Sequence, residues 1–230
     1  NGIDQGRIYR ITPKGTPALN WSNRLKMGDE TSAQLVAALA SPNAWRRGHA
    51  QRLLVDRQDL SVVPLLEKLA AGGESPLGRL HALWTLHGMG ALGEKFLLQA
   101  LGDPEAGVRE NAIRMSEDLL KQTGSGLLAD RLIALKNDKS PKVRFQLLAS
   151  LGFVNTPAAV AARKELLFSN LEDNWMQIAA LSAVPAGDDS LLEEVLAGYR
   201  KGNPQYASLT ERISNMTGAT GDIDRISRLI

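Results

Sequence analysis

The stretch that decides the fold is Asp103-Pro104-Glu105-Ala106-Gly107-Val108-Arg109-Glu110-Asn111-Ala112. Its first residue has a side-chain oxygen that can accept a free backbone N–H of a first helical turn. Proline follows, where its missing N–H is not needed and its φ is already helical. The stretch therefore predicts a helix start, with Arg109 early in the helix and Ala112 three residues later.

The pair of a capping residue and a proline recurs along the chain, at Ser41-Pro42, Ser75-Pro76, Asp103-Pro104, Ser140-Pro141, Thr156-Pro157 and Asn203-Pro204. Two further starts have capping-box spacing, Thr31 with Gln34 and Ser190 with Glu193. The prolines expected to open second helices are 34, 28 and 37 residues apart from Pro42 to Pro141, and Pro204 follows 63 residues later. A period of about 33 residues with two helices in each is typical of an α-solenoid.

We therefore predict an all-α fold, a right-handed α-α superhelix of about six helix pairs. The composition agrees, because Leu and Ala dominate while aromatic residues are only 5%. The fifth pair lacks both the proline and the arginine of the pattern, with Asn174 and Gln177 in those places. The expected pairs cover residues 31–57, 60–88, 93–122, 125–152, 156–185 and 188–217.

An arginine recurs early in the second helices, at Arg47, Arg79, Arg109 and Arg144. Three residues later the chain carries a small or apolar residue, at Ala50, Ala82, Ala112, Leu147 and Ala180. This order of residues, with Asp-Pro or Ser-Pro followed by Val-Arg and then Ala, resembles the pattern of the HEAT-repeat family. The resemblance covers residues 31–217. The resemblance implies that these arginines form a structural ladder, bonded to acidic or carbonyl groups of the adjacent repeat. The alternative is a basic stripe that contacts phosphates.

Three segments follow from this pattern. Residues 1–29 are expected to be an extended remnant of a preceding domain, with a short strand at 7–12 closed by Pro13-Lys14-Gly15. Residues 31–217 form the solenoid. Residues 218–230 begin a further helix or a cap, because apolar residues at 223, 226, 229 and 230 have helical spacing. We read both ends as cut edges of a larger protein.

Composition excludes several functions. The chain has no Cys, which excludes disulfides, zinc–thiolate sites, Cys nucleophiles and covalent haem attachment within it. Twenty-seven basic residues against 25 acidic ones give no general attraction to nucleic acid or anionic lipid. The sequence contains no run of 18 apolar residues, which is about the length that a membrane span needs. His49, His81 and His87 lack the spacing of a metal-binding helix. We predict no catalytic, cofactor or metal site in this chain.

The best candidate for a partner surface is the cluster of Trp45, Arg46 and His49, which combines aromatic and basic side chains. The alternative is that this cluster caps the first helix pair. Trp84 lies in a mostly apolar run and is expected in the core. Trp175 falls in a second helix like the other two tryptophans, so an aromatic stripe that stacks bases or binds a peptide is also conceivable.

A second resemblance bears on function. Gly6-Arg7-Ile8-Tyr9-Arg10-Ile11 looks like the closing strand of a sugar-dehydrogenase-type β-propeller. Residues 37–90, with Ser41-Pro42-Asn43-Ala44-Trp45-Arg46-Arg47 and Ser75-Pro76-Leu77-Gly78-Arg79-Leu80-His81-Ala82, are similar to the HEAT region of membrane-bound dehydrogenase-like haem proteins of Planctomycetes and Verrucomicrobia. That family orders a propeller, a HEAT domain and a c-type cytochrome. The resemblance implies an extracytoplasmic, periplasmic parent protein whose haem c belongs to another domain.

Two functions remain open at this point. The first is a non-catalytic scaffold that binds adjacent domains of the parent or another protein. The second is a nucleic-acid-binding or DNA-glycosylase-like HEAT protein, which the arginines and tryptophans suggest. The balanced charge favours the first and predicts no nucleic-acid partner.

Overall fold

The computed structural model describes residues 14–15, 26–184, 191, 194–196, 199, 204–219, 221 and 223. All regular structure in this part of the chain is helical, so the all-α prediction is confirmed there. The predicted strand at 7–12 and the predicted Ser190–Glu193 capping box lie outside the described residues. Most of the helix predicted after residue 218 also lies outside them.

The helices follow one another as pairs. Their bounds are α1 (Ser32–Ala38) with α2 (Ala44–Arg57), α3 (Val63–Gly72) with α4 (Pro76–Gly88), α5 (Glu94–Ala100) with α6 (Ala106–Thr123), α7 (Gly126–Ile133) with α8 (Pro141–Ser150), and α9 (Pro157–Phe168) with α10 (Asn174–Ser182). Helix α12 (Pro204–Ala219) comes last. Short 3-10 helices cover Met27–Asp29, Leu60–Val62, Ala134–Asn137 and Leu151–Phe153.

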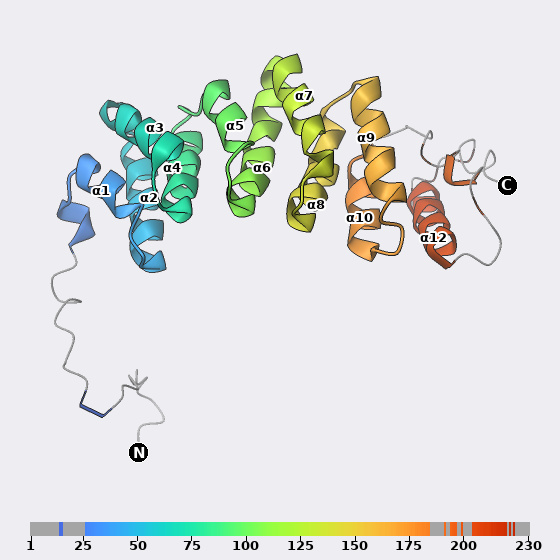
Figure 1. Ribbon diagram of the computed structural model, residues 1–230, viewed down its shortest axis with the longest axis horizontal. Coiled ribbons are helices and arrows are strands. Elements are labelled where there is room, and N and C mark those ends of the chain that lie inside the picture. Colours follow the sequence, from blue (N-terminus) through green and yellow to red (C-terminus); the bar gives the residue numbers. More distant parts are fainter. Residues whose placement is uncertain are drawn as a thin grey trace.

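The pairs stand side by side in an arched row (Figure 1). Figure 1 shows the first helix of each pair along the outer side of the arch and the second helix along the inner side. Second helices of successive pairs pack directly on one another, α2 on α4, α4 on α6, α6 on α8 and α8 on α10. This arrangement is consistent with an α-helical solenoid.

Capping residues begin several helices as predicted. The Thr31 side chain accepts from the backbone N–H of Gln34, and the Gln34 side chain accepts in return from the Thr31 N–H, which completes a capping box. Ser75 caps α4 and Thr156 caps α9 in the same manner. These bonds satisfy backbone donors that the first helical turn leaves without an intrahelical partner.

Two of the predicted helix starts are wrong by two residues. Helix α2 begins at Ala44 with Asn43 as its cap, and α6 begins at Ala106 after Glu105. The prolines Pro42 and Pro104 therefore lie in the loop before the helix. At the second loop the cause is visible, because the Asp103 carboxylate accepts the N–H of Glu105 and an arginine of the preceding pair.

The core runs along the row between the two layers of helices. The small or apolar residues predicted three positions after the recurrent arginine are all buried, at Ala50, Ala82, Ala112, Leu147 and Ala180. Leucines of the first helices, such as Leu35, Leu66 and Leu97, are buried against them. Because short side chains separate the second helices, these helices approach closely, and the inner side of the arch is formed where they meet.

The fourth and fifth pairs meet at Gly152, where the backbones touch. A Cβ added to Gly152 would lie 2.6 Å from the carbonyl oxygen of Ala183 and 2.8 Å from its Cα. We predict that Gly152→Ala lowers the free energy of unfolding by about 2 kcal/mol, because two backbones must separate. Gly107→Ala is the matched control, since nothing lies within 4 Å of its added Cβ in α6. It should stabilise the protein by roughly 0.5 kcal/mol. Urea denaturation measures both, and equal effects of the two substitutions would contradict the packing described.

Candidate functional site

Two of the recurrent arginines link the loops of successive helix pairs. Nε and Nη2 of Arg79 donate to the two carboxylate oxygens of Asp103 at 2.7 and 2.8 Å, and its Nη1 donates to the Gly73 carbonyl at 2.7 Å. Arg109 repeats this geometry one pair later, with Asp138 at the same two distances and the Asp103 carbonyl at 2.7 Å. Each guanidinium thus joins its own loop to the next one.

The aspartates of these links are also fixed by their own loops. Oδ1 of Asp103 accepts the N–H of Glu105, and Oδ1 of Asp138 accepts the N–H of Ser140, both at 2.8 Å. The four side chains of the two ion pairs are between 6% and 15% exposed. A bidentate pair that is this well buried and fully hydrogen bonded strongly resists the loss of one partner.

This environment lowers the pKa of both carboxyls. Burial raises the pKa of Asp103, but the hydrogen bonds from Arg79 and from the Glu105 backbone outweigh burial, and the net shift is downward. For Asp138 the hydrogen bond from Arg109 is the largest cause of the lowered pKa. The pKa values of Arg79 and Arg109 are raised in turn, first by the hydrogen bonds to these aspartates. Both pairs are therefore ionised near neutral pH.

Among the described residues, the other two arginines donate only to carbonyls of their own loops. Nη1 of Arg47 donates to Ser41 and Pro42, and Nη1 of Arg144 donates to Asp138 and Lys139. The position equivalent to Asp103 is Gly73 opposite Arg47 and Leu171 opposite Arg144. The Nε of Arg47 is buried and has no hydrogen-bond partner among the described residues. We call the set of Arg47, Arg79, Arg109 and Arg144, with these loop partners, the arginine ladder.

Gln177 occupies the arginine position in the fifth pair. Its Nε2 donates to the Leu171 carbonyl at 2.8 Å, six residues earlier, as each arginine does in its own loop. The Gln177 amide therefore preserves the hydrogen bond within the loop, but it is uncharged and cannot form an ion pair with the next helix pair.

The structure separates the three residues of the predicted partner surface. Trp45 is 49% exposed, and its ring lies 3.9 Å from that of His49, measured between centroids. The Nδ1 of His49 lies 2.9 Å from the Trp45 carbonyl oxygen. Arg46 instead donates to Glu30 at 3.0 Å, next to the N-terminal edge of α1. Trp45 and His49 thus form one exposed aromatic contact, and Arg46 belongs to an ion pair beside it.

The second helices expose further large apolar side chains, of which Trp175 was predicted only as part of an aromatic stripe and Leu77 and Ile178 were not predicted. Leu77 of α4 and Trp175 and Ile178 of α10 are exposed, Trp175 to 68%. Trp45, Leu77 and Trp175 each lie two positions before the recurrent arginine or its Gln177 equivalent. That shared position is the signal that could have found them. Trp84 is half-buried, and its Nε1 donates to Asn111 of α6 at 3.0 Å, so it joins two second helices.

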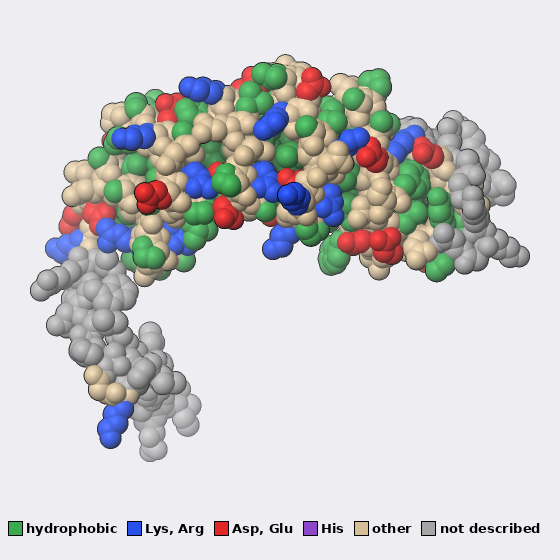
Figure 2. All heavy atoms as spheres, viewed as in Figure 1, with side chains coloured by type: hydrophobic (Ala, Val, Ile, Leu, Met, Phe, Trp, Pro, Cys, Tyr) green, Lys and Arg blue, Asp and Glu red, His purple; other side chains and the backbone are tan. Residues whose placement is uncertain are grey.

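Charged side chains are mixed over the surface. Figure 2 shows Lys and Arg interspersed with Asp and Glu along the middle of the arch, with no continuous basic face on the side drawn. Among the described residues, no group of three His, Cys, Asp or Glu side chains is placed to hold a metal ion. No described helix is both long and apolar enough to cross a membrane.

The histidines make structural contacts. His81 Nδ1 lies 2.6 Å from the Gln51 side-chain oxygen, and His87 Nε2 lies 3.0 Å from Asp118. Burial, and then the charge of Arg47, lower the pKa of His81. His81 and His87 thus each join successive second helices.

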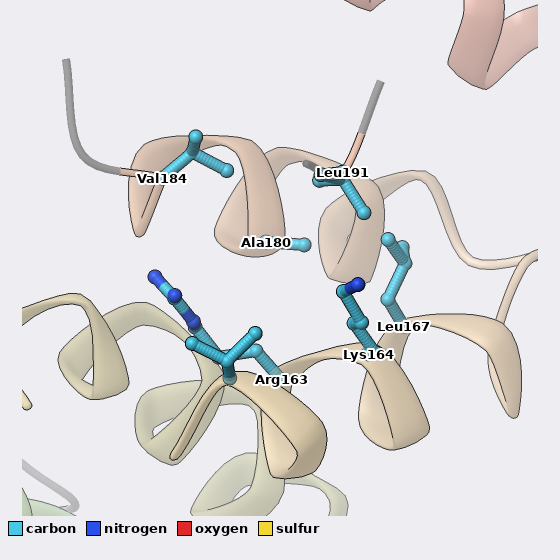
Figure 3. A pocket seen from close by; sticks show the side chains of 7 residues that line it. Arg163, Lys164, Leu167, Ala180, Val184 and Leu191 are labelled. Atoms are coloured by element: carbon cyan, nitrogen blue, oxygen red, sulfur yellow. The ribbon is translucent and has the colours of Figure 1, made fainter. Parts of the chain in front are cut away.

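A small pocket lies between α9 and α10 (Figure 3). Its walls are mainly apolar, with Leu167 on one side and Ala180 and Val184 on the other. The two charged residues at its rim are engaged, because Arg163 donates to the Ala183 carbonyl and Lys164 pairs with Glu194. Among the described residues, both charged groups that line the pocket are thus held in contacts within the fold.

Comparison with protein-family models finds no match to this chain, and a search of curated proteins finds none either.

We predict that the arginines of the ladder differ in their contribution to stability. Arg109→Met should lower the free energy of unfolding by about 3 kcal/mol, because it leaves the Asp138 carboxylate buried without its partner. Arg47→Met should cost about 1 kcal/mol or less, since it removes no ion pair and eliminates a donor that has no acceptor. Chemical denaturation of both variants tests this. Equal losses would show that the ion pair contributes nothing beyond the loop bonds.

The lowered carboxyl pKa values predict an acid-sensitive stability. A group whose folded-state pKa is depressed stabilises the fold above its unfolded value of about 4, and this is lost as the pH falls through the folded value. The melting temperature of the native protein should therefore fall steeply below about pH 4. The double variant Asp103→Asn, Asp138→Asn keeps the side-chain acceptors of the turns but not their charges. Its melting temperature should therefore fall less steeply over the same pH range. Parallel profiles from pH 7 to pH 2.5 would contradict the assignment.

Proposed function

We propose that this chain is a non-catalytic scaffold that binds protein on the second helices of a HEAT-type, right-handed superhelix of about six pairs. The observation that carries the proposal is the exposure of Trp45, Leu77 and Trp175 at one equivalent position of the second helices α2, α4 and α10. The helices between them, α6 and α8, carry Gly107 and Lys142 at that position. Large aromatic side chains dominate the energetics of protein interfaces, because they bury much area at low entropic cost.

The arginine ladder supports the same function. It fixes the loops from which α4, α6 and α8 begin, so exposed residues on those helices keep a defined spacing. A rigid row of helices presents an extended surface without reorganisation on binding, which suits a scaffold.

The resemblance of residues 37–90 to the HEAT region of dehydrogenase-like haem proteins suggests which partners to test first. We propose that they are a propeller and a cytochrome c domain of one extracytoplasmic parent, with haem c and the redox chemistry confined to those domains.

The contacts of the arginines speak against nucleic acid as the partner. Arg79 and Arg109 are bound on both edges of the guanidinium by carbonyls and carboxylates, and Arg47 is buried. Three of the four residues that could have formed a phosphate-binding stripe are therefore committed within the fold. Phosphate binding needs several accessible cations acting together.

Photo-crosslinking in the natural full-length protein tests the proposal. A benzophenone amino acid at position 45 or 175 should give adducts with peptides of a propeller, a cytochrome domain or a separate partner protein, identified by mass spectrometry. Position 127 is the matched control, because Leu127 is 64% exposed but belongs to the first-helix layer, in α7. Equal adduct yields from all three positions would overturn the assignment of the binding face.

A further inference from the structure

One edge of the Arg144 guanidinium differs from its equivalents in the ladder. Nη1 of Arg144 lies 2.7 and 3.4 Å from two carbonyls of its own loop, the same pair of distances that Arg79 shows. The shared tether gives the two guanidinium groups the same anchor. In Arg79 the Nε and Nη2 edge holds Asp103 of the next loop. In Arg144 no described carboxylate is bonded to that edge, because the next loop carries Leu171.

This edge of Arg144 is accessible, unlike that of Arg47. Arg144 is half-buried and lines an open, polar groove between the α7–α8 connection and the end of α9. Arg47, the other arginine without a carboxylate, is only 7% exposed. The groove also presents polar groups on both sides, from Asn137, Ser169 and Asn170.

The charges in the groove leave one cation in excess. Glu165 is paired with Lys136, and both carboxylate oxygens of Asp138 accept from Arg109, while the charge of Arg144 also acts on Asp138. Arg144 is the cation that these pairs do not neutralise. The two carboxylates beside it limit the negative charge that a ligand can bring, which favours a single carboxylate over a doubly charged phosphate.

We propose that the Arg144 groove binds a carboxylate, from an Asp or Glu side chain of a protein partner, in the bidentate geometry that Asp103 and Asp138 show in the ladder. The ligand then supplies the carboxylate that the chain itself lacks between the fourth and fifth pairs. This inference rests on the proposed scaffold function, since the acidic residue belongs to the bound protein.

The test follows the side-chain Nε–Hε resonances of the arginines by NMR while a short blocked peptide with a single glutamate among alanines is titrated into the protein. The Arg144 resonance should shift and saturate, while those of Arg79 and Arg109 stay in place. Arg144→Gln should weaken peptide binding about tenfold, the effect of losing one good charge-assisted contact. Arg114→Gln is the matched control, because it removes an exposed arginine of α6 outside the groove. It should leave binding nearly unchanged.

A second pair of variants places a side chain of the protein itself opposite Arg144. Leu171→Asp should place a carboxylate opposite Arg144 and abolish the peptide-induced shift, whereas the uncharged Leu171→Asn should retain it. Equal weakening by Arg144→Gln and Arg114→Gln would show diffuse charge attraction and overturn the proposal. Stronger binding of inorganic phosphate than of the peptide would overturn the carboxylate assignment. The crosslinks from positions 45 and 175 report on the scaffold function separately, because neither residue lines the groove.

Discussion

The arrangement of the helix pairs depends on a guanidinium that serves two loops at once. In each loop where it occurs, an arginine early in the second helix donates to a loop carbonyl six residues before it, at Ser41, Gly73, Asp103 and Asp138. Its other edge reaches the carboxylate of the next pair at Asp103 and Asp138. The same side chain therefore closes a helical hairpin and sets its distance from the next hairpin.

Packing beneath the ladder makes this linkage effective. The buried alanines Ala50, Ala82, Ala112 and Ala180 bring second helices close enough for side chains such as Trp84 and His87 to reach the next pair. Apolar burial supplies most of the stabilising free energy in such a stack but has little directional preference. The hydrogen bonds of the ladder are directional, so they restrict how far one pair can slide or rotate against its neighbour.

Much of this fold could be predicted from one sequence, because the helix starts and the buried small residues repeat. The Thr31–Gln34 capping box and the starts at Pro76, Pro141 and Pro157 follow from local chemistry alone. The predicted start of α6 is wrong because the Asp103 side chain does not cap the helix. It accepts hydrogen bonds from the Glu105 N–H and from Arg79 in the loop before the helix begins. Local propensity does not include an arginine 24 residues away in the sequence.

The exposure of the tryptophans does not follow from the sequence of their own helices. Trp84 and Trp175 both lie in short, largely apolar helices, yet Trp84 is half-buried and Trp175 is exposed. The difference comes from the neighbouring pair, where Asn111 accepts from the Trp84 indole. The Trp175 indole has no such acceptor among the described residues. Exposure in a stacked row therefore depends on the residue that the next pair presents, which periodicity within one helix does not contain.

The two interruptions of the ladder show that the same change in sequence has different consequences in different packing. At Gly73 the close approach of Leu69 leaves no room for a side chain, since an added Cβ would lie 2.7 Å from the Leu69 carbonyl oxygen. Arg47 is accordingly buried, and its Nε has no acceptor among the described residues. At Leu171 the loops on either side form an open polar groove, and Arg144 lines it. At Gly73 the missing carboxylate leaves a buried arginine that no other molecule can reach. At Leu171 it leaves an ionised arginine in an open groove, where another molecule can bind it. Of the two arginines that hold no carboxylate, Arg144 is thus the one that another molecule can reach.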